Sequence, residues 1–132
     1  MSELRDKFAG CILGGAVGDA LGYPVEFLKL DEIIEEYGPE GITEHKLYNG
    51  KALVSDDTQM TMYTACGLLK GYTRFATCGI MGDWAEYVHR AYLDWRYTQF
   101  ENYGKPLALG LSWLLNIEEL YSCRAPGNTS LS

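Results

Sequence analysis

The chain has 132 residues, of which 47% are hydrophobic and 22% charged, and its formal net charge at pH 7 is -7. This length and composition fit one folded domain with a sizeable core and exclude a disordered chain. The acidic balance argues against nucleic-acid binding by bulk charge. The four cysteines form no CxxC pair, so we expect them to be reduced in a cytoplasmic protein. No signal peptide is expected, because charged residues precede the first apolar run.

The first predicted element is a helix from about Glu3 to Leu21. Glycine recurs on it at every fourth position, at Gly10, Gly14, Gly18 and Gly22. Glycine costs roughly 1 kcal/mol against alanine inside a helix, so the stripe predicts close approach of another backbone. A transmembrane helix is not expected, because Phe8–Val17 is shorter than the ~20 residues that spanning needs and Asp19 ends it. Asp19 itself is expected to bond local backbone groups.

The next segments lead from this helix toward a polar cluster. Gly22-Tyr23-Pro24 should end the helix, and Glu26, flanked by apolar residues, is expected from the residues alone to be exposed. A short amphipathic helix is predicted over Leu30–Tyr37. Residues 40–53 read as a long loop in which Asn49-Gly50 allows a small hairpin. Such a loop is a reasonable place for substrate contacts.

The stretch Val54–Met60 places two adjacent carboxylates and two hydroxyls beside each other. One interpretation is an ordinary helix start, with Ser55 as the N-cap and two aspartates in the first turn. The other is a site for a hard cation, since carboxylate and hydroxyl oxygens suit Mg²⁺, Ca²⁺ or Mn²⁺. The two are compatible, because a helix start can hold side chains rigidly toward a metal. The triplet Ser55, Asp56 and Asp57 cannot complete an octahedral shell without other ligands.

Helices continue through the second half of the chain. The predicted order is a helix over 55–69, a connection over 71–82, a helix capped by Asp83, a loop over 97–105 and a last helix over 106–117. Residues 129–132 read as the start of a further helix. His45 and His89 lack metal-ligand spacing, so neither is expected to carry chemistry.

Three segments taken together resemble a known family. They are Gly10–Gly22, Pro24–Phe27 and Ser55–Met60, and Arg124–Thr129 matches a further stretch of bacterial members. In order and spacing they are similar to the N-terminal part of the ADP-ribosylglycohydrolase family, of the dinitrogenase-reductase-activating glycohydrolase type. The resemblance implies a compact, multi-helix all-α fold. It also implies that residues 1–132 form the N-terminal part of a single domain.

The resemblance also implies a chemistry. The family hydrolyses the glycosidic bond between ADP-ribose and a protein side chain or related acceptor, at a dinuclear Mg²⁺ or Mn²⁺ centre. Ser55, Asp56 and Asp57 match its N-terminal metal ligands, and Glu26, Asp56 and Asp57 its catalytic carboxylates. This places Glu26 at the metals rather than simply in solvent. Asn128 and Thr129 match the phosphate-binding side of the cleft, where helix N-termini suit anions.

The chain departs from the family pattern in its second half. The late Asp-x-Asp-Thr cluster and the glycine-rich substrate loop have no match, so this chain is expected to be a truncated portion, inactive alone or nearly so. Its apolar helix faces should then self-associate or cover themselves with a missing C-terminal segment. Expected partners are an ADP-ribosylated protein or an ADP-ribose-type small molecule, without nucleic acid or membrane. Alternatives are a non-catalytic ADP-ribose-binding or structural protein, and an unrelated helical metal-binding domain.

Overall fold

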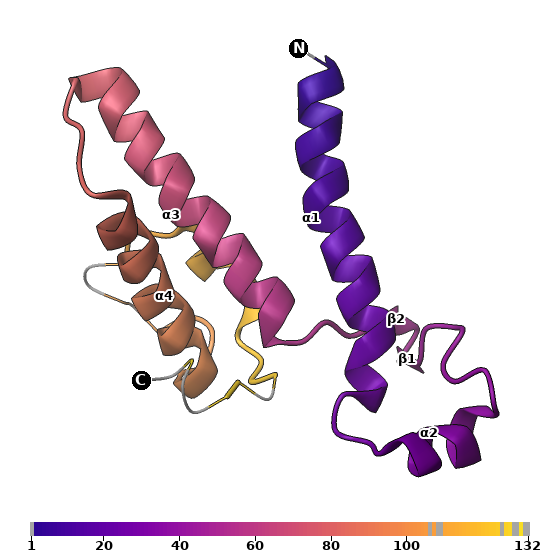
Figure 1. The fold of residues 1–132 in the computed structure, drawn as a ribbon. Helices are drawn as coiled ribbons and strands as arrows, with labels where there is room; N and C mark the ends of the chain where they lie inside the picture. Colours follow the sequence, from indigo (N-terminus) through magenta and orange to yellow (C-terminus); the bar gives the residue numbers. More distant parts are fainter. Residues whose placement is uncertain (1, 106, 108–109, 125, 128–129, 131–132) are drawn as a thin grey trace. The chain divides into compact units, whose positions relative to one another are not determined.

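A computed structural model describes residues 2–105, 107, 110–124, 126–127 and 130. In chain order the elements are α1 (Ser2–Gly22), the 3-10 helix η1 (Tyr23–Val25), α2 (Leu30–Tyr37), β1 (Leu47–Tyr48), β2 (Lys51–Ala52), α3 (Asp56–Cys78), α4 (Trp84–Phe100), and the 3-10 helices η2 (Trp113–Asn116) and η3 (Glu118–Leu120), as Figure 1 shows. The expected all-α class is confirmed, because strand occurs in the described part only as one short hairpin. The chain divides into two compact units, Met1–Thr58 and Gln59–Ser132, each of which is described by itself below.

The local signals of the first unit predict its elements well. The observed α1 lies within a residue of the predicted one at each end, and α2 matches its prediction. The hairpin is also confirmed, with Leu47 opposite Ala52 and Tyr48 opposite Lys51. Its turn residues Asn49 and Gly50 have φ values of 51° and 79°. Positive φ at both central positions is what a two-residue hairpin turn of the favoured twist requires.

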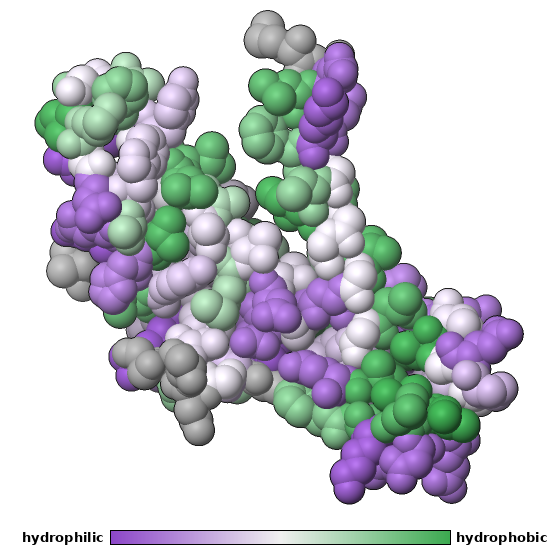
Figure 2. Space-filling view, viewed as in Figure 1, coloured by the Kyte–Doolittle hydropathy of each residue, from purple (hydrophilic) through white to green (hydrophobic). Residues whose placement is uncertain are grey.

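The glycine stripe on α1 does not have the predicted role. A Cβ atom built at Gly10, Gly14, Gly18 or Gly22 would meet no described atom within 4 Å, beyond the helix's own nearby backbone. Large apolar side chains of α1 are exposed, and Figure 2 shows hydrophobic surface along this helix (Leu4, Phe8, Ile12, Leu13 and Val17). Residues Glu3–Val25 are long and apolar enough to cross a membrane, with a mean hydropathy of 1.3. Core helices of soluble proteins and signal sequences satisfy the same test.

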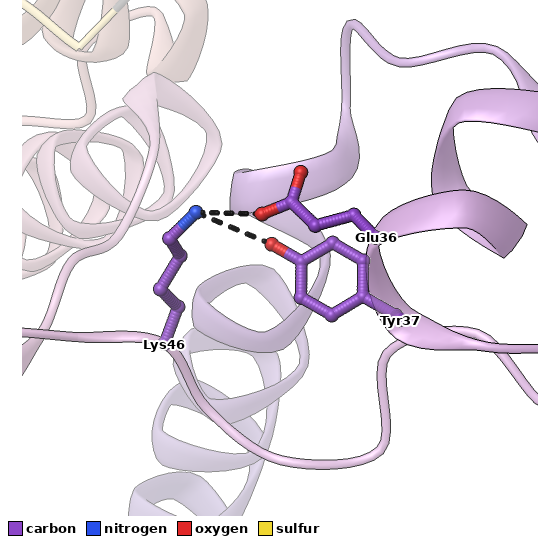
Figure 3. Close-up of polar contacts among 3 residues, drawn as sticks. All are labelled: Glu36, Tyr37 and Lys46. Atoms are coloured by element: carbon purple, nitrogen blue, oxygen red, sulfur yellow. Dashed lines mark hydrogen bonds and ion pairs between the residues drawn. The ribbon is translucent and has the colours of Figure 1, made fainter.

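The segment between α2 and the hairpin is tied to both preceding helices. Figure 3 shows the Lys46 ammonium donating to the Glu36 carboxylate at 3.0 Å and to the Tyr37 hydroxyl at 3.4 Å. The Glu36 side chain raises the pKa of Lys46, and Lys46 in turn lowers the pKa of Glu36. One residue earlier, the His45 ring lies 3.1 Å from the carbonyl oxygen of Val17 on α1. The segment before the hairpin is therefore held by the side chains of two adjacent residues, His45 and Lys46.

In the second unit, α3 is longer than predicted. The predicted connection over 71–82 is wrong, because the helix continues to Cys78. Gly71 does not end the helix but makes room for aromatic rings: a Cβ there would lie 2.9 Å from the Tyr87 ring and 3.0 Å from the Trp84 ring. The helix ends instead at Gly79, whose φ is 67° and whose N–H donates to the Phe75 carbonyl at 2.9 Å. A left-handed glycine is a common helix stop.

The helix α4 begins where its cap predicts and ends later than expected. The Asp83 carboxylate accepts a hydrogen bond from the Ala85 N–H at 2.9 Å, which confirms the predicted N-cap. The predicted loop over 97–105 begins too early, since α4 runs to Phe100. The helix predicted over 106–117 is also wrong for the residues described there, which form only short 3-10 turns.

The buried Asp94 of α4 holds the segment that leads into η2. One oxygen of its carboxylate accepts from the N–H groups of Leu111 at 2.9 Å and Ser112 at 2.7 Å. The Ser112 hydroxyl then accepts from the Leu114 N–H at 3.2 Å. A side chain from another helix thus satisfies amides that a helix start would otherwise expose. Burial raises the pKa of Asp94, and the two backbone hydrogen bonds lower it.

The core of the second unit surrounds Trp95, which is fully buried. Its other fully or nearly fully buried members are Tyr63, Cys66, Ala91, Leu114 and Leu120. Polar groups accompany them: the Gln59 side-chain oxygen accepts from the Trp95 indole N–H and from the Gln99 amide, each at 3.1 Å. The Gln59 amide donates to the Ser122 carbonyl at 3.0 Å. Gln59 therefore joins α3, α4 and the C-terminal segment of this unit.

Candidate functional site

The polar cluster at the start of α3 is built as a capped helix N-terminus. The Ser55 hydroxyl accepts a hydrogen bond from the Asp57 N–H at 3.1 Å, so Ser55 is the N-cap. Asp56 and Asp57 occupy the first turn, where the helix dipole favours negative charge. Ser55 and Asp56 are buried, with 2% and 8% of their surface exposed, whereas Asp57 is exposed. Two of the three predicted ligands are thus shielded from solvent.

Asp19 holds this helix start from α1. One oxygen of its carboxylate accepts from the Ser55 N–H at 2.9 Å and also from the Thr58 hydroxyl. The prediction that Asp19 would bond local backbone groups is therefore wrong, since its partners lie 36 and 39 residues away. Reasoning from the sequence missed this residue as part of the site. The available signal was a carboxylate placed on an otherwise apolar and glycine-rich helix.

The carboxylates of the cluster repel one another. Burial raises the pKa of Asp56, and the charges of Asp57 and Asp19 raise it further, while a hydrogen bond from its own backbone lowers it. The pKa of Glu26 is also raised, first by desolvation and then by Asp56, Asp57 and Asp19. Glu26 is exposed, as its flanking sequence predicts, yet it lies within the field of the cluster. The first unit thus places Asp19, Asp56 and Asp57 near enough to Glu26 for their charges to raise its pKa.

The donor set suits part of a hard-cation shell. Asp56 and Asp57 offer carboxylate oxygens and Ser55 a hydroxyl oxygen, the ligand types that Mg²⁺ and Mn²⁺ prefer. Within the described ranges, however, no three Asp, Glu, His or Cys side chains converge closely enough to hold a metal ion. The chemistry of the donors therefore fits such a cation, but their number supplies only part of its coordination. Asn128 and Thr129, predicted to bind substrate, lie outside the described residues.

A groove of about 680 Å³ in the second unit is separate from this cluster. It lies along α4 and is lined mainly by apolar side chains, among them Leu93, Tyr97, Phe100, Leu107 and Leu111. None of the predicted site residues lines it. Charged side chains also border the groove, namely Arg90, Asp94, Arg96 and Glu101, but none of them matches a motif of the predicted site.

The raised pKa of Asp56 predicts how stability depends on pH. The folded chain binds this proton more tightly than the unfolded chain does, so ionisation above the ordinary value of 3.8 destabilises the fold. Asp56→Asn should remove that penalty and raise Tm by roughly 2–5 °C at pH 7 in a chelating buffer. The gain should vanish near pH 3, where the parent carboxyl is protonated in both states. Thermal melts of both proteins at the two pH values measure this.

The matched control is Glu40→Gln, which removes one negative charge from an exposed loop position. The Tm of this variant should equal that of the parent protein at both pH values. A gain from Asp56→Asn that is equally large at pH 3 would mean that side-chain shape, rather than charge, is responsible.

Comparison with known proteins identifies the class. A sequence profile described as ADP-ribosylglycohydrolase matches residues 1–131. The chain belongs to the ADP-ribosylglycohydrolase family. The resemblance carried by the motifs around Asp19, Glu26 and Ser55 is thereby confirmed at the level of the family.

Two relatives are similar over parts of the chain. An ADP-ribosyl-[dinitrogen reductase] glycohydrolase of Rhodospirillum rubrum is 38% identical over 66 residues, which cover 46% of this chain and 21% of that protein. An uncharacterized protein of Archaeoglobus fulgidus is 57% identical over 35 residues, which cover 26% of this chain and 12% of that protein. The matched stretches therefore span about a fifth or less of these relatives. No solved structure shows a significant match to the chain.

Proposed function

We propose that Ser55, Asp56, Asp57 and Glu26 of this chain contribute to a cation-dependent site that hydrolyses the glycosidic bond between ADP-ribose and a modified protein side chain or related acceptor. The observation that carries the proposal is the gathering of Asp56, Asp57 and Glu26 around a capped helix start. Membership of the family supports the glycohydrolase class. The name of the Rhodospirillum rubrum relative supports ADP-ribose as the glycosyl group that is transferred to water while the acceptor leaves.

Each residue has a defined role in this proposal. Ser55, Asp56 and Asp57 would hold Mg²⁺ or Mn²⁺ with their oxygens, and further ligands would come from water or from another part of the protein. When bound, the cations supply positive charge that offsets the carboxylates and polarises the substrate. Glu26 would take the proton of the attacking water, because a carboxylate with a raised pKa is a stronger base. Its exposure gives it access to that water.

The direct test is release of ADP-ribose from an ADP-ribosylated protein by this protein in the presence of Mg²⁺ or Mn²⁺. The double variant Asp56→Asn plus Asp57→Asn should release it at least ~100-fold more slowly, since two charged ligands are lost together. The control is Asp31→Asn plus Glu32→Gln, a second adjacent acidic pair that lies exposed on α2. Equal rates for the parent and the Asp56/Asp57 variant would refute the proposal.

A second candidate is a protein of the same fold that binds ADP-ribose without cleaving its linkage. It is favoured by the absence, among the described side chains, of a third acidic or imidazole ligand beside Asp56 and Asp57. Calorimetry with ADP-ribose and Mg²⁺ separates the candidates. The second candidate is supported if ADP-ribose binds with measurable heat and the ADP-ribosylated substrate remains uncleaved after prolonged incubation.

A further inference from the structure

We propose that Asp19 is a positioning residue that fixes the Ser55–Thr58 turn for cation binding; the cation itself rests on the proposed function above. The geometry is direct. One carboxylate oxygen of Asp19 accepts both the Ser55 N–H, at 2.9 Å, and the Thr58 hydroxyl. These two groups bracket Asp56 and Asp57, so a single oxygen on α1 holds both ends of the acidic turn.

Two hydrogen bonds to one carboxylate oxygen occupy both of its in-plane lone pairs. That oxygen therefore has no lone pair left in its plane for a cation, and it acts on the turn through the two groups that donate to it. Asp56 and Asp57 lie between these two partners in the sequence. Asp19 is thus assigned a supporting role through this oxygen.

The contact also orders the hydroxyl groups around the turn. Because Thr58 donates its only hydroxyl proton to Asp19, its oxygen can offer a neighbour lone pairs alone. The Ser55 hydroxyl accepts from the Asp57 N–H and keeps one lone pair and its proton. The Thr58 oxygen is thereby left as an acceptor, and the Ser55 oxygen keeps one lone pair that a cation could use.

The burial of the partners makes the contact hard to replace. Ser55 and Thr58 are 2% and 8% exposed, so water has little access to the N–H and the hydroxyl that Asp19 satisfies. Without the Asp19 carboxylate, these two donors would be buried without an acceptor, which costs free energy. The turn would then have to shift until water could reach them. Asp19 therefore fixes the turn through two buried partners.

The test uses the 132-residue chain with three variants: Asp19→Ala, Asp19→Asn and, as a control on the same helix, Asp6→Asn. Mn²⁺ affinity is measured from the electron paramagnetic resonance signal of free Mn²⁺. Exchange of the Ser55 amide proton is measured by NMR in a chelating buffer. We expect Asp19→Ala to raise the Mn²⁺ dissociation constant and the Ser55 exchange rate at least tenfold each. Asp6→Asn, which removes an exposed charge, should change neither.

Asp19→Asn provides the rescue that distinguishes positioning from charge. An asparagine oxygen can accept the same two hydrogen bonds, so this variant should restore most of the Ser55 protection and of the Mn²⁺ affinity that alanine loses. It also keeps the side-chain volume, so it remains informative if Asp19→Ala fails to fold. Unchanged Ser55 exchange in Asp19→Ala would overturn the positioning role. So would an Asp19→Asn variant whose Mn²⁺ affinity is as weak as that of Asp56→Asn, which removes a proposed ligand charge.

The two proposals fail in different ways. If the parent chain does not bind Mn²⁺, the proposed cation site of this chain is wrong. The exchange measurement still decides the positioning role of Asp19, because it needs no metal. Faster exchange of the Ser55 amide proton in Asp19→Ala supports that role, and an exchange rate equal to that of the parent refutes it.

Discussion

Replacing Trp95 with alanine is expected to destabilise the chain by about 3–5 kcal/mol, the range for deleting a large buried aromatic side chain. Trp95 is fully buried at the centre of the second unit and packs edge-to-face on Tyr92, with ring centroids 6.5 Å apart. Its indole N–H also donates to Gln59. Urea unfolding followed by circular dichroism measures the loss, and a change below 1 kcal/mol would mean that this core does not form as described.

Trp95→Phe is the matched variant, because it keeps a ring in the core and removes the indole N–H. The Gln59 oxygen still accepts from the Gln99 amide at 3.1 Å, so no buried acceptor is left without a donor. We expect a loss of about 1–2 kcal/mol, well below that of alanine. Equal losses for the two variants would assign the stability to the hydrogen bond rather than to ring volume.

Gly67→Ala is expected to destabilise the chain by about 1–3 kcal/mol, although alanine is the better helix former by roughly 1 kcal/mol. A Cβ atom at Gly67 would lie 2.8 Å from both the Tyr87 carbonyl oxygen and the Val88 Cα. Both atoms belong to the backbone of α4, so no side-chain rotation can relieve the clash. Helices α3 and α4 would have to separate at this point. Thermal melts of the variant and the parent measure the change.

Gly14→Ala is the control that should change stability in the opposite direction. Gly14 lies inside α1, and a Cβ there would meet nothing within 4 Å outside the nearby helix backbone. The substitution should therefore raise stability by about 0.5–1 kcal/mol through helix propensity. Destabilisation by Gly14→Ala would reveal a close neighbour on the glycine stripe of α1, as the sequence first predicted.

Helix starts were predictable from the sequence, whereas helix ends were less so. The caps Ser55 and Asp83 and the turn Asn49-Gly50 act within a few residues, so their chemistry is visible in the sequence. Gly71 looked like a helix end because its packing partners, the rings of Trp84 and Tyr87, belong to the next helix. Only the folded chain reveals that a glycine makes room for a distant ring rather than for a turn.

In the candidate site, too, contacts between neighbouring residues were predictable and contacts between distant segments were not. Ser55, Asp56 and Asp57 are adjacent, and their oxygen-rich pattern predicted a capped turn that could receive a cation. Asp19 was missed because its partners are remote in sequence, and side-chain hydrogen bonds between distant segments leave no periodic signal. Glu26 is exposed, as its flanking residues predict, and the charges of Asp56, Asp57 and Asp19 add to the desolvation that raises its pKa. Its place at a metal centre stays a prediction.

The contacts of Lys46 and His45 bear on how readily the acidic turn forms. The contact between Asp19 and Ser55 closes a loop of 36 residues, and closing a flexible loop becomes costlier as its length grows. Lys46 bonds to Glu36 only ten residues away, and His45 contacts Val17 across 28 residues. The two shorter closures reduce the length of flexible chain that the contact between Asp19 and Ser55 has to close. Removing the Lys46 and His45 contacts is therefore expected to make formation of the acidic turn less favourable.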